Sequence, residues 1–166
     1  MNTVHTTANT HKRQFAVAAA QPGASYMAQA LAYRHPGVTE RIADTLNVGG
    51  AEAALIFLET KRFIWLCGVS DEILVPSPTI DEGWHAFVLH TRDYAAFCEQ
   101  YIGRFIHHQP HTRADRAVRK AGHDAYKRTQ ALAREVFGSS LSNHWARHAD
   151  SSTNCSGSTN CQAPYR

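Results

Sequence analysis

The feature that most constrains the fold is an apolar, helix-patterned segment in the first half of the 166-residue chain. A helix is predicted from Ala51 to Leu66, and apolar residues cover much of its circumference: Leu55, Phe57, Leu58, Phe63, Ile64, Trp65 and Leu66. A helix that is apolar on most sides is typical of a buried position. The wider apolar run contains Glu59, Lys61 and Arg62 and falls short of the roughly 20 apolar residues that cross a bilayer. We therefore expect a deeply buried helix and no membrane span.

Helical patterns also account for most of the rest of the chain, and signals for strands are poor. Further helices are predicted at residues 25–34, 39–47, 79–90, 91–103 and 112–137. Proline and glycine pairs separate them, because these residues end helices or start turns. With 43% hydrophobic and 19% charged residues, the composition is that of a globular protein with a real core. The expected fold is all-α, a single compact domain of about five helices over residues 25–146.

Two helix starts are predicted from capping residues. Thr39 is a predicted N-cap, because a threonine hydroxyl accepts a hydrogen bond from an amide of the first turn. Pro36-Gly37 is expected to end the helix that precedes it. Thr79, with Glu82 three residues later, has the spacing of a capping box.

Both ends of the chain lack helical periodicity. Residues 1–24 are predicted to be a flexible leader, and residues 147–166 a low-complexity tail rich in Ser, Thr, Asn and Gly. No Asp or Glu precedes Glu40, which is also a property of transit peptides. The small number of arginines favours instead a disordered leader of a cytoplasmic protein.

The four cysteines are not predicted to be metal ligands. Cys67 and Cys98 lie in apolar helical patterns, where a reduced cysteine packs as a small hydrophobic residue. Cys155 and Cys161 lie in the tail, and their spacing is not the Cys-x-x-Cys of a zinc or redox motif. A disulfide between these two is an open alternative.

The candidate site lies in two histidine-rich stretches. Asp81 and His85 are four residues apart on a predicted helix, so they share a face with Cβ atoms about 5–6 Å apart. His107 and His108 follow the next predicted helix, and the turn there can bring one of them back beside His85. His90 lies about 140° around the helix from His85 and joins the site only if the helix ends before it.

Three interpretations of this cluster are open. In the first, Asp81, His85 and His108 are the ligands of a divalent metal such as zinc, with His90 and His107 as spare candidates. A metal site with an open position implies hydrolytic chemistry, with a bound water as nucleophile. In the second, the same side chains form a buried polar network in a non-enzymatic interaction or scaffold module, which implies a protein partner. In the third, the Asp–His pair is a metal-free acid–base site.

The chain carries no motif of a known reaction class. His-Glu-x-x-His, a phosphate-binding loop, a dinucleotide fingerprint and Gly-x-Ser-x-Gly are all absent from the sequence. Whether the protein is an enzyme is therefore not specified by its sequence.

The residues around the cluster resemble a known family. The pattern runs from an Asp through Trp-His to a Tyr, a Cys, a Gly and a His: Asp81, Trp84, His85, Tyr94, Cys98, Gly103 and His108. It resembles the central motif of the glycine-rich domain-containing protein-like family, and Phe137-Gly138 and Trp145 resemble its closing residues. The resemblance covers roughly residues 50–146, without the glycine-rich tail, and implies no established enzymatic activity. Some members have a second His where this chain has Phe87, which leaves the other histidines as substitutes.

The last predicted helix has two contrasting faces. One is basic: Arg113, Arg116, Lys120, His123, Lys127 and Arg134. The other is apolar: Ala114, Val118, Ala121, Ala125, Leu132 and Val136. Basic side chains at this spacing can follow the phosphates of a nucleic acid. However, the formal net charge is only +3, no aromatic residue is interleaved, and Asp115, Asp124 and Glu135 dilute the helix. A solvated outer face is favoured over weak nucleic-acid binding.

Overall fold

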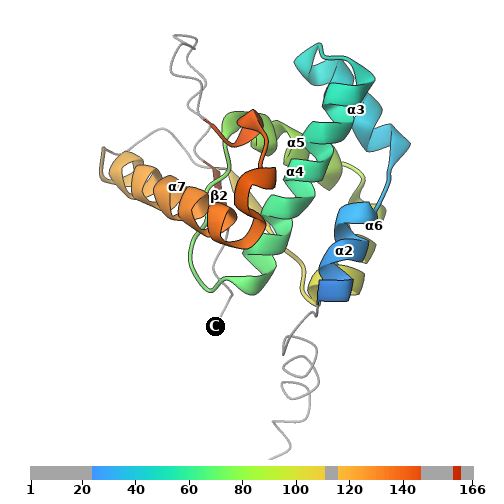
Figure 1. Ribbon diagram of the computed structural model, residues 1–166. Coiled ribbons are helices and arrows are strands. Elements are labelled where there is room, and N and C mark those ends of the chain that lie inside the picture. The colour runs from blue at the N-terminus through green and yellow to red at the C-terminus, as the bar shows by residue number, and fades with distance from the viewer. Residues whose placement is uncertain (1–23, 111–115, 147–158, 162–166) are drawn as a thin grey trace, which may run out of the picture.

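The computed structural model describes residues 24–110, 116–146 and 159–161, and within them the fold is all-α, as predicted. Six α-helices are present in the described residues, one for each of the six predicted segments: α2 (Ala24–Ala32), α3 (Pro36–Leu46), α4 (Gly50–Val69), α5 (Pro78–Val88), α6 (Thr91–Phe97) and α7 (Arg116–Phe137) (Figure 1). The predicted leader and most of the predicted tail, Cys155 included, lie outside the described residues.

Short irregular elements complete the described chain. A π-helix continues α6 over Cys98–Ile102, and 3-10 turns occupy Gly138–Ser140 and Asn143–Trp145. Strands β1 (His108–Pro110) and β2 (Thr159–Cys161) pair antiparallel over three residues each. This pairing joins segments that are far apart in the sequence.

Helix α4 is the centre of the fold, which confirms the prediction from its apolar circumference. Phe63, Ile64 and Leu66 are completely buried, and Ile56 and Trp65 are nearly so. In Figure 1, α4 runs through the middle of the molecule, with α7 on one side and α2 and α3 on the other. Its neighbours therefore take their positions from contacts with α4.

A carboxylate within α4, that of Glu59, is completely buried as well, and it has hydrogen-bond partners. Glu59 accepts hydrogen bonds from Trp145 Nε1 at 2.7 Å and Arg62 Nη1 at 3.0 Å. The amide of Ser142 donates to the same carboxylate at 3.2 Å. A buried carboxylate is tolerated only when it is paired in this way. The network holds the chain after α7 against α4, and Trp145 docks there as predicted, with 2% of its surface exposed.

Two predicted helix starts are wrong by a few residues, for one physical reason. Helix α3 begins at Pro36, with His35 rather than Thr39 as its N-cap. Helix α5 begins at Pro78, with Ser77 rather than Thr79 as its N-cap. Proline lacks an amide hydrogen and has a fixed φ, so it fits the first position of a helix. Pro36 therefore starts a helix here and does not merely end the preceding one.

Helix α5 lies very close to α4, and a glycine makes this possible. At Gly83 a Cβ atom would collide with the hydroxyl of Thr60 on α4. That hydroxyl donates to the carbonyls of Ile56 at 2.9 Å and Ile80 at 3.4 Å. The absence of a side chain at Gly83 therefore allows α5 to pack closely against α4, and the next residue, Trp84, is completely buried.

The buried face of α7 differs in part from the predicted apolar face. Ala125, Thr129 and Ala133 are buried, whereas Val136 is 39% exposed. Thr129 is suited to burial because its hydroxyl accepts the amide of Val75 at 2.8 Å and donates to Ala125 at 2.9 Å. A pattern that counts only apolar residues misses a threonine whose hydrogen bonds are satisfied.

No helix in the described ranges has the length and apolar character needed to cross a membrane.

Candidate metal centre

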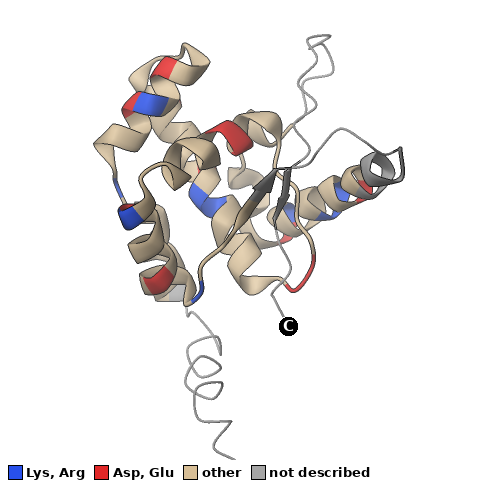
Figure 2. Ribbon diagram, turned by 180° about the vertical axis from the view of Figure 1, so that it is seen from behind, with Lys and Arg blue, Asp and Glu red and all other residues tan. Residues whose placement is uncertain are grey.

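Helix α5 supplies the first two side chains of the candidate site. Asp81 is in its first turn and is buried, with its side chain 8% exposed, and His85 follows one turn later with its side chain 42% exposed. The carboxylate Oδ2 lies 3.7 Å from His85 Nδ1. The Asp81 carboxylate is therefore buried, whereas the His85 imidazole is partly exposed to solvent. Figure 2 shows the acidic start of α5 near the middle of the reverse face.

His108 reaches Asp81 from a segment 27 residues away. The π-helix ends at Gly103, whose φ of 79° is in the left-handed region that glycine tolerates. The chain then reverses and passes back along α5. His108 Nε2 lies 3.0 Å from Asp81 Oδ1, and the His108 side chain is 6% exposed.

A chain of buried hydrogen bonds fixes the returning segment. Trp84 Nε1 donates to the Tyr94 hydroxyl at 2.9 Å, and this hydroxyl donates to the carbonyl of Ile106 at 2.6 Å. Trp84 and Tyr94 are completely buried. The His108 ring packs edge-on against Trp84 at a centroid distance of 4.4 Å. Trp84 and Tyr94 thus act as positioning residues for His108.

Burial also determines the chemistry of Tyr94 and Cys98. Desolvation, followed by the nearby Cys98, raises the pKa of Tyr94 far above its usual range. Desolvation likewise raises the pKa of the Cys98 thiol, although the backbone at Ile106 and the Tyr94 hydroxyl offset part of this effect. Both groups therefore keep their protons at neutral pH. They act as hydrogen-bonding and packing groups, since a thiol with a raised pKa is a poor nucleophile.

Asp81, His85 and His108 form a compact set that we call the α5 triad. Each offers a ligand atom, and these atoms lie within 4.8 Å of one another. The two carboxylate oxygens face different imidazoles, and the two imidazole rings lie 4.2 Å apart. Ligands of a tetrahedral zinc ion are bound at about 2.0–2.2 Å, so they lie roughly 3.3–3.6 Å from each other. The two Asp–His distances, 3.0 and 3.7 Å, lie on either side of that range, and they involve different oxygens of the carboxylate.

A second carboxylate lies at the solvent side of the α5 triad. Glu82 Oε2 is 3.8 Å from His85 Nδ1, and its side chain is 46% exposed. Glu82 is not the capping-box partner that its spacing from Thr79 predicts, because Ser77 and not Thr79 is the N-cap of α5. Its closeness to His85 follows from their i, i+3 spacing and could have been found in the sequence.

A second set of ligand-capable residues, His35, His90 and Asp93, joins two parts of the chain. We call it the α3–α6 triad. His35 Nε2 lies 3.3 Å from Asp93 Oδ2, and the rings of His35 and His90 lie 4.5 Å apart. His90, a spare candidate for the first site, belongs here. The sequence offered no signal that joins His35 to it, because His35 was placed in a loop between helices.

The hydrogen bonding of His35 makes the α3–α6 triad a poor metal site. The amide of Val38 donates to His35 Nδ1 at 3.1 Å, so this nitrogen carries no proton. In a neutral imidazole the proton must then be on Nε2, the nitrogen that faces Asp93. A protonated nitrogen has no lone pair for a metal. His35 is therefore an N-cap that donates to a carboxylate.

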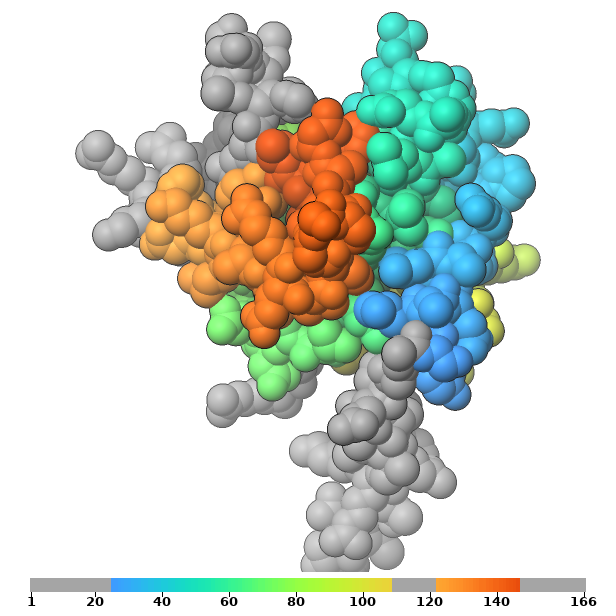
Figure 3. Space-filling view, in the orientation of Figure 1, coloured from blue at the N-terminus to red at the C-terminus, as the bar shows by residue number. Residues whose placement is uncertain are grey.

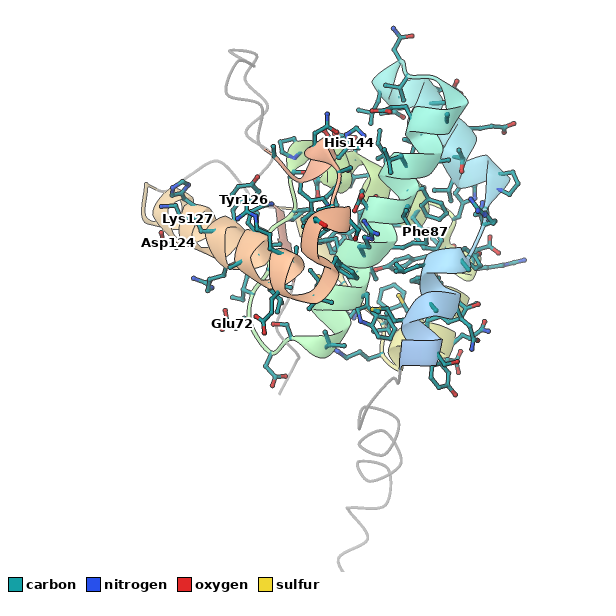
Figure 4. The ribbon with its side chains drawn as sticks, viewed as in Figure 1. Glu72, Phe87, Asp124, Tyr126, Lys127 and His144 are labelled. Carbon is teal, nitrogen blue, oxygen red and sulfur yellow. The ribbon has the colours of Figure 1, made fainter. Side chains whose placement is uncertain are left out.

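The other spare candidate, His107, lies away from both triads. It is exposed, and its ring packs against that of Phe105 at 4.8 Å. Consecutive residues in extended chain point to opposite sides, so placing His108 beside Asp81 directs His107 outward. Phe87, where some relatives in the predicted family have a second His, is completely buried among aromatic rings, as Figure 4 shows.

A family model described as UCP032817-like matches residues 25–137, which is more than half of the chain and includes both triads. The chain belongs to the UCP032817-like family. This family is uncharacterised, so membership assigns no reaction. The match does not confirm the resemblance to the glycine-rich domain-containing protein-like family, which stays a prediction. No curated protein and no solved structure matches the chain.

The described part of α7 does not form a continuous basic face. Lys127 and Arg134 are exposed, but Asp124 and Glu135 are exposed on the same helix. Arg128 pairs with Glu72 at 3.0 Å. Arg113 lies outside the described residues. This part of the surface therefore gives weak nucleic-acid binding no added support.

Proposed function

We propose that the α5 triad binds a divalent metal ion such as zinc. The observation that carries this proposal is the position of Asp81, whose two oxygens lie 3.0 and 3.7 Å from nitrogens of His108 and His85. Imidazole and carboxylate are ordinary zinc ligands. Unlike His35, neither histidine is fixed by a backbone amide that donates to its ring in the described structure.

The residues of the α5 triad differ in their exposure to solvent, and this difference supports a site that is open on one side. Asp81 and His108 are held rigidly in the protein, whereas His85 and Glu82 are close to half exposed. Three protein ligands with one position facing solvent is the arrangement of catalytic rather than structural zinc sites. When bound, zinc would supply an activated water, which is the basis for proposing hydrolytic chemistry. The exposed Glu82 carboxylate is positioned to accept a proton on that side.

The competing interpretation is a buried polar network without metal. Its support is the short contact between His108 and Asp81, which would be a charge-assisted hydrogen bond when His108 is protonated. In this reading the triad fixes the segment after Gly103 on α5, and the protein is a scaffold module. The two interpretations predict different responses to zinc and to loss of His108.

The test is a zinc titration against a chromophoric chelator. The wild-type chain should bind one zinc ion, His108→Ala should lose about 100-fold or more in affinity, and His90→Ala should bind as the wild type does. Zinc should also raise the melting temperature of the wild type and of His90→Ala, but not of His108→Ala. If the wild type binds no zinc and His108→Ala is strongly destabilised, the polar network is the correct interpretation.

A further inference from the structure

A cavity separate from the α5 triad lies between α2, α3 and α4. Its volume is about 560 Å³, within the range of small-molecule sites. Apolar residues form much of its wall, including Leu31, Ala54, Leu55 and Leu58. The surfaces of the three helices adjoin on the face shown in Figure 3.

A buried ammonium group lines this cavity. Lys61 is 3% exposed, and its Nζ donates to the carbonyls of Leu31 and Tyr33, both at 2.5 Å. It also lies 5.0 Å from the centroid of the Phe57 ring. An ammonium group has three donors, so one N–H remains after the two carbonyls are satisfied.

This ammonium has no negative partner in the described chain. No carboxylate of the described residues lies within ion-pair distance of Lys61, and the other cation of the wall, Arg34, has the same sign. Burial, with a further contribution from Arg34, lowers the pKa of Lys61 to about 8. A buried charge with the carbonyl dipoles alone is an unfavourable arrangement that an anion would relieve.

The other charged residues that line the cavity restrict which anions can bind in it. Glu40 also lines the cavity, and it is exposed at the rim. Its negative charge disfavours a dianion such as a phosphate monoester. A single carboxylate, in contrast, needs only the free N–H of Lys61 and the attraction of Arg34. The apolar wall then requires an apolar body on the ligand.

We infer that the α2–α3–α4 cavity binds a small amphipathic monocarboxylate. Its carboxylate pairs with Lys61, and its hydrocarbon part lies along Ala54, Leu55 and Leu58. No residue of the α5 triad lines the cavity. His35, which belongs to the α3–α6 triad, does line it. Metal binding and carboxylate binding can therefore succeed or fail independently.

Octanoate is a suitable probe, with octanol as its uncharged counterpart, and calorimetric titration measures both. Octanoate should bind at least about tenfold more tightly than octanol, since a charge-assisted hydrogen bond contributes more than a neutral one. Lys61→Met should remove about tenfold or more of the octanoate affinity. Lys127→Met is the matched control, because Lys127 is exposed on α7, on the other side of the molecule (Figure 4), and it should bind as the wild type does.

Lys61→Met also removes hydrogen bonds to two carbonyls, so a second variant tests the site without changing Lys61. Ala54→Phe adds a ring on the half-buried wall of the cavity and should reduce the affinity for both probes. If octanoate does not bind, if octanol binds equally well, or if Ala54→Phe leaves octanoate binding unchanged, the inference is overturned.

The pH dependence gives a third measurement. The groups around Lys61 that carry or acquire charge are Arg34, Tyr33, His35 and Glu40. A bound carboxylate favours the protonated amine, so octanoate affinity should be steady below about pH 7 and about twofold lower at pH 8. It should fall by up to about tenfold per pH unit above the free-protein pKa of about 8. Lys61→Met should show no such fall, and a fall of equal size in that variant would contradict the assignment.

Discussion

The α5 triad and the α3–α6 triad contain the same residue types, one aspartate and two histidines, yet these residues differ in burial and in hydrogen bonding. In the α5 triad the aspartate is buried between two imidazoles. In the α3–α6 triad the Asp93 side chain is 54% exposed and lies 3.3 Å from His35 Nε2. A cation at Asp93 would compete with water for an exposed carboxylate, whereas Asp81 is already largely desolvated and oriented.

The larger difference concerns lone pairs. His35 accepts the Val38 amide through Nδ1, which requires its other nitrogen to keep a proton. In the α5 triad, His108 Nε2 also faces a carboxylate, but no amide of the described residues donates to its other nitrogen, so the proton can move there when a metal binds. Proximity of ligand-type residues is therefore not enough to define a metal site, because each nitrogen must also be free to lose its proton.

The largest expected difference comes from the two aspartates. Asp81→Asn should reduce zinc affinity by about 100-fold, since it removes the charge between the two imidazoles. Asp93→Asn, the matched change in the other triad, should alter the affinity by less than about twofold. Competition with a chromophoric chelator measures both. An equal loss in the two variants would show that the triads do not differ as described.

A second, smaller effect tests how the α5 triad is held together. Tyr94→Phe removes the hydroxyl between Trp84 and Ile106 and leaves a buried donor and a buried acceptor without partners. It should lower the free energy of unfolding by about 2–3 kcal/mol and zinc affinity by about tenfold. Urea denaturation and chelator competition measure the two effects.

Tyr101→Phe is the control for Tyr94→Phe. Tyr101 is half-buried in the same aromatic cluster, and its hydroxyl makes no hydrogen bond in the described structure. This substitution should change neither quantity appreciably. A Tyr94→Phe protein with unchanged zinc affinity would mean that His108 reaches Asp81 without this support.

The smallest expected effect concerns His35 as a helix cap. His35→Ala should lower the free energy of unfolding by about 1 kcal/mol, the usual contribution of an N-cap. His35→Asn should recover most of this loss, because asparagine is a good N-cap. Neither variant should change zinc affinity. Loss of zinc binding in both would instead make His35 a ligand.

Several elements of the fold follow from the sequence because they depend on local patterns. The burial of α4 follows from apolar residues on most of its sides, and the shared face of Asp81 and His85 follows from their spacing of four. Helix starts were less predictable. Ser77, Thr79 and Thr39 are all acceptable N-caps, and the following proline decided the outcome in both helices.

The sequence by itself determined that this chain is helical, that α4 is buried, and that a carboxylate and an imidazole share one face of α5. Only the tertiary structure decided that His108, and not His107 or His90, lies beside Asp81. The reason is that this contact depends on a glycine turn and on a tyrosine hydroxyl that fixes a distant carbonyl, and neither leaves a periodic signal. The tertiary structure likewise left Lys61 buried without a negative partner among the described residues, because its position follows from contacts between separate helices.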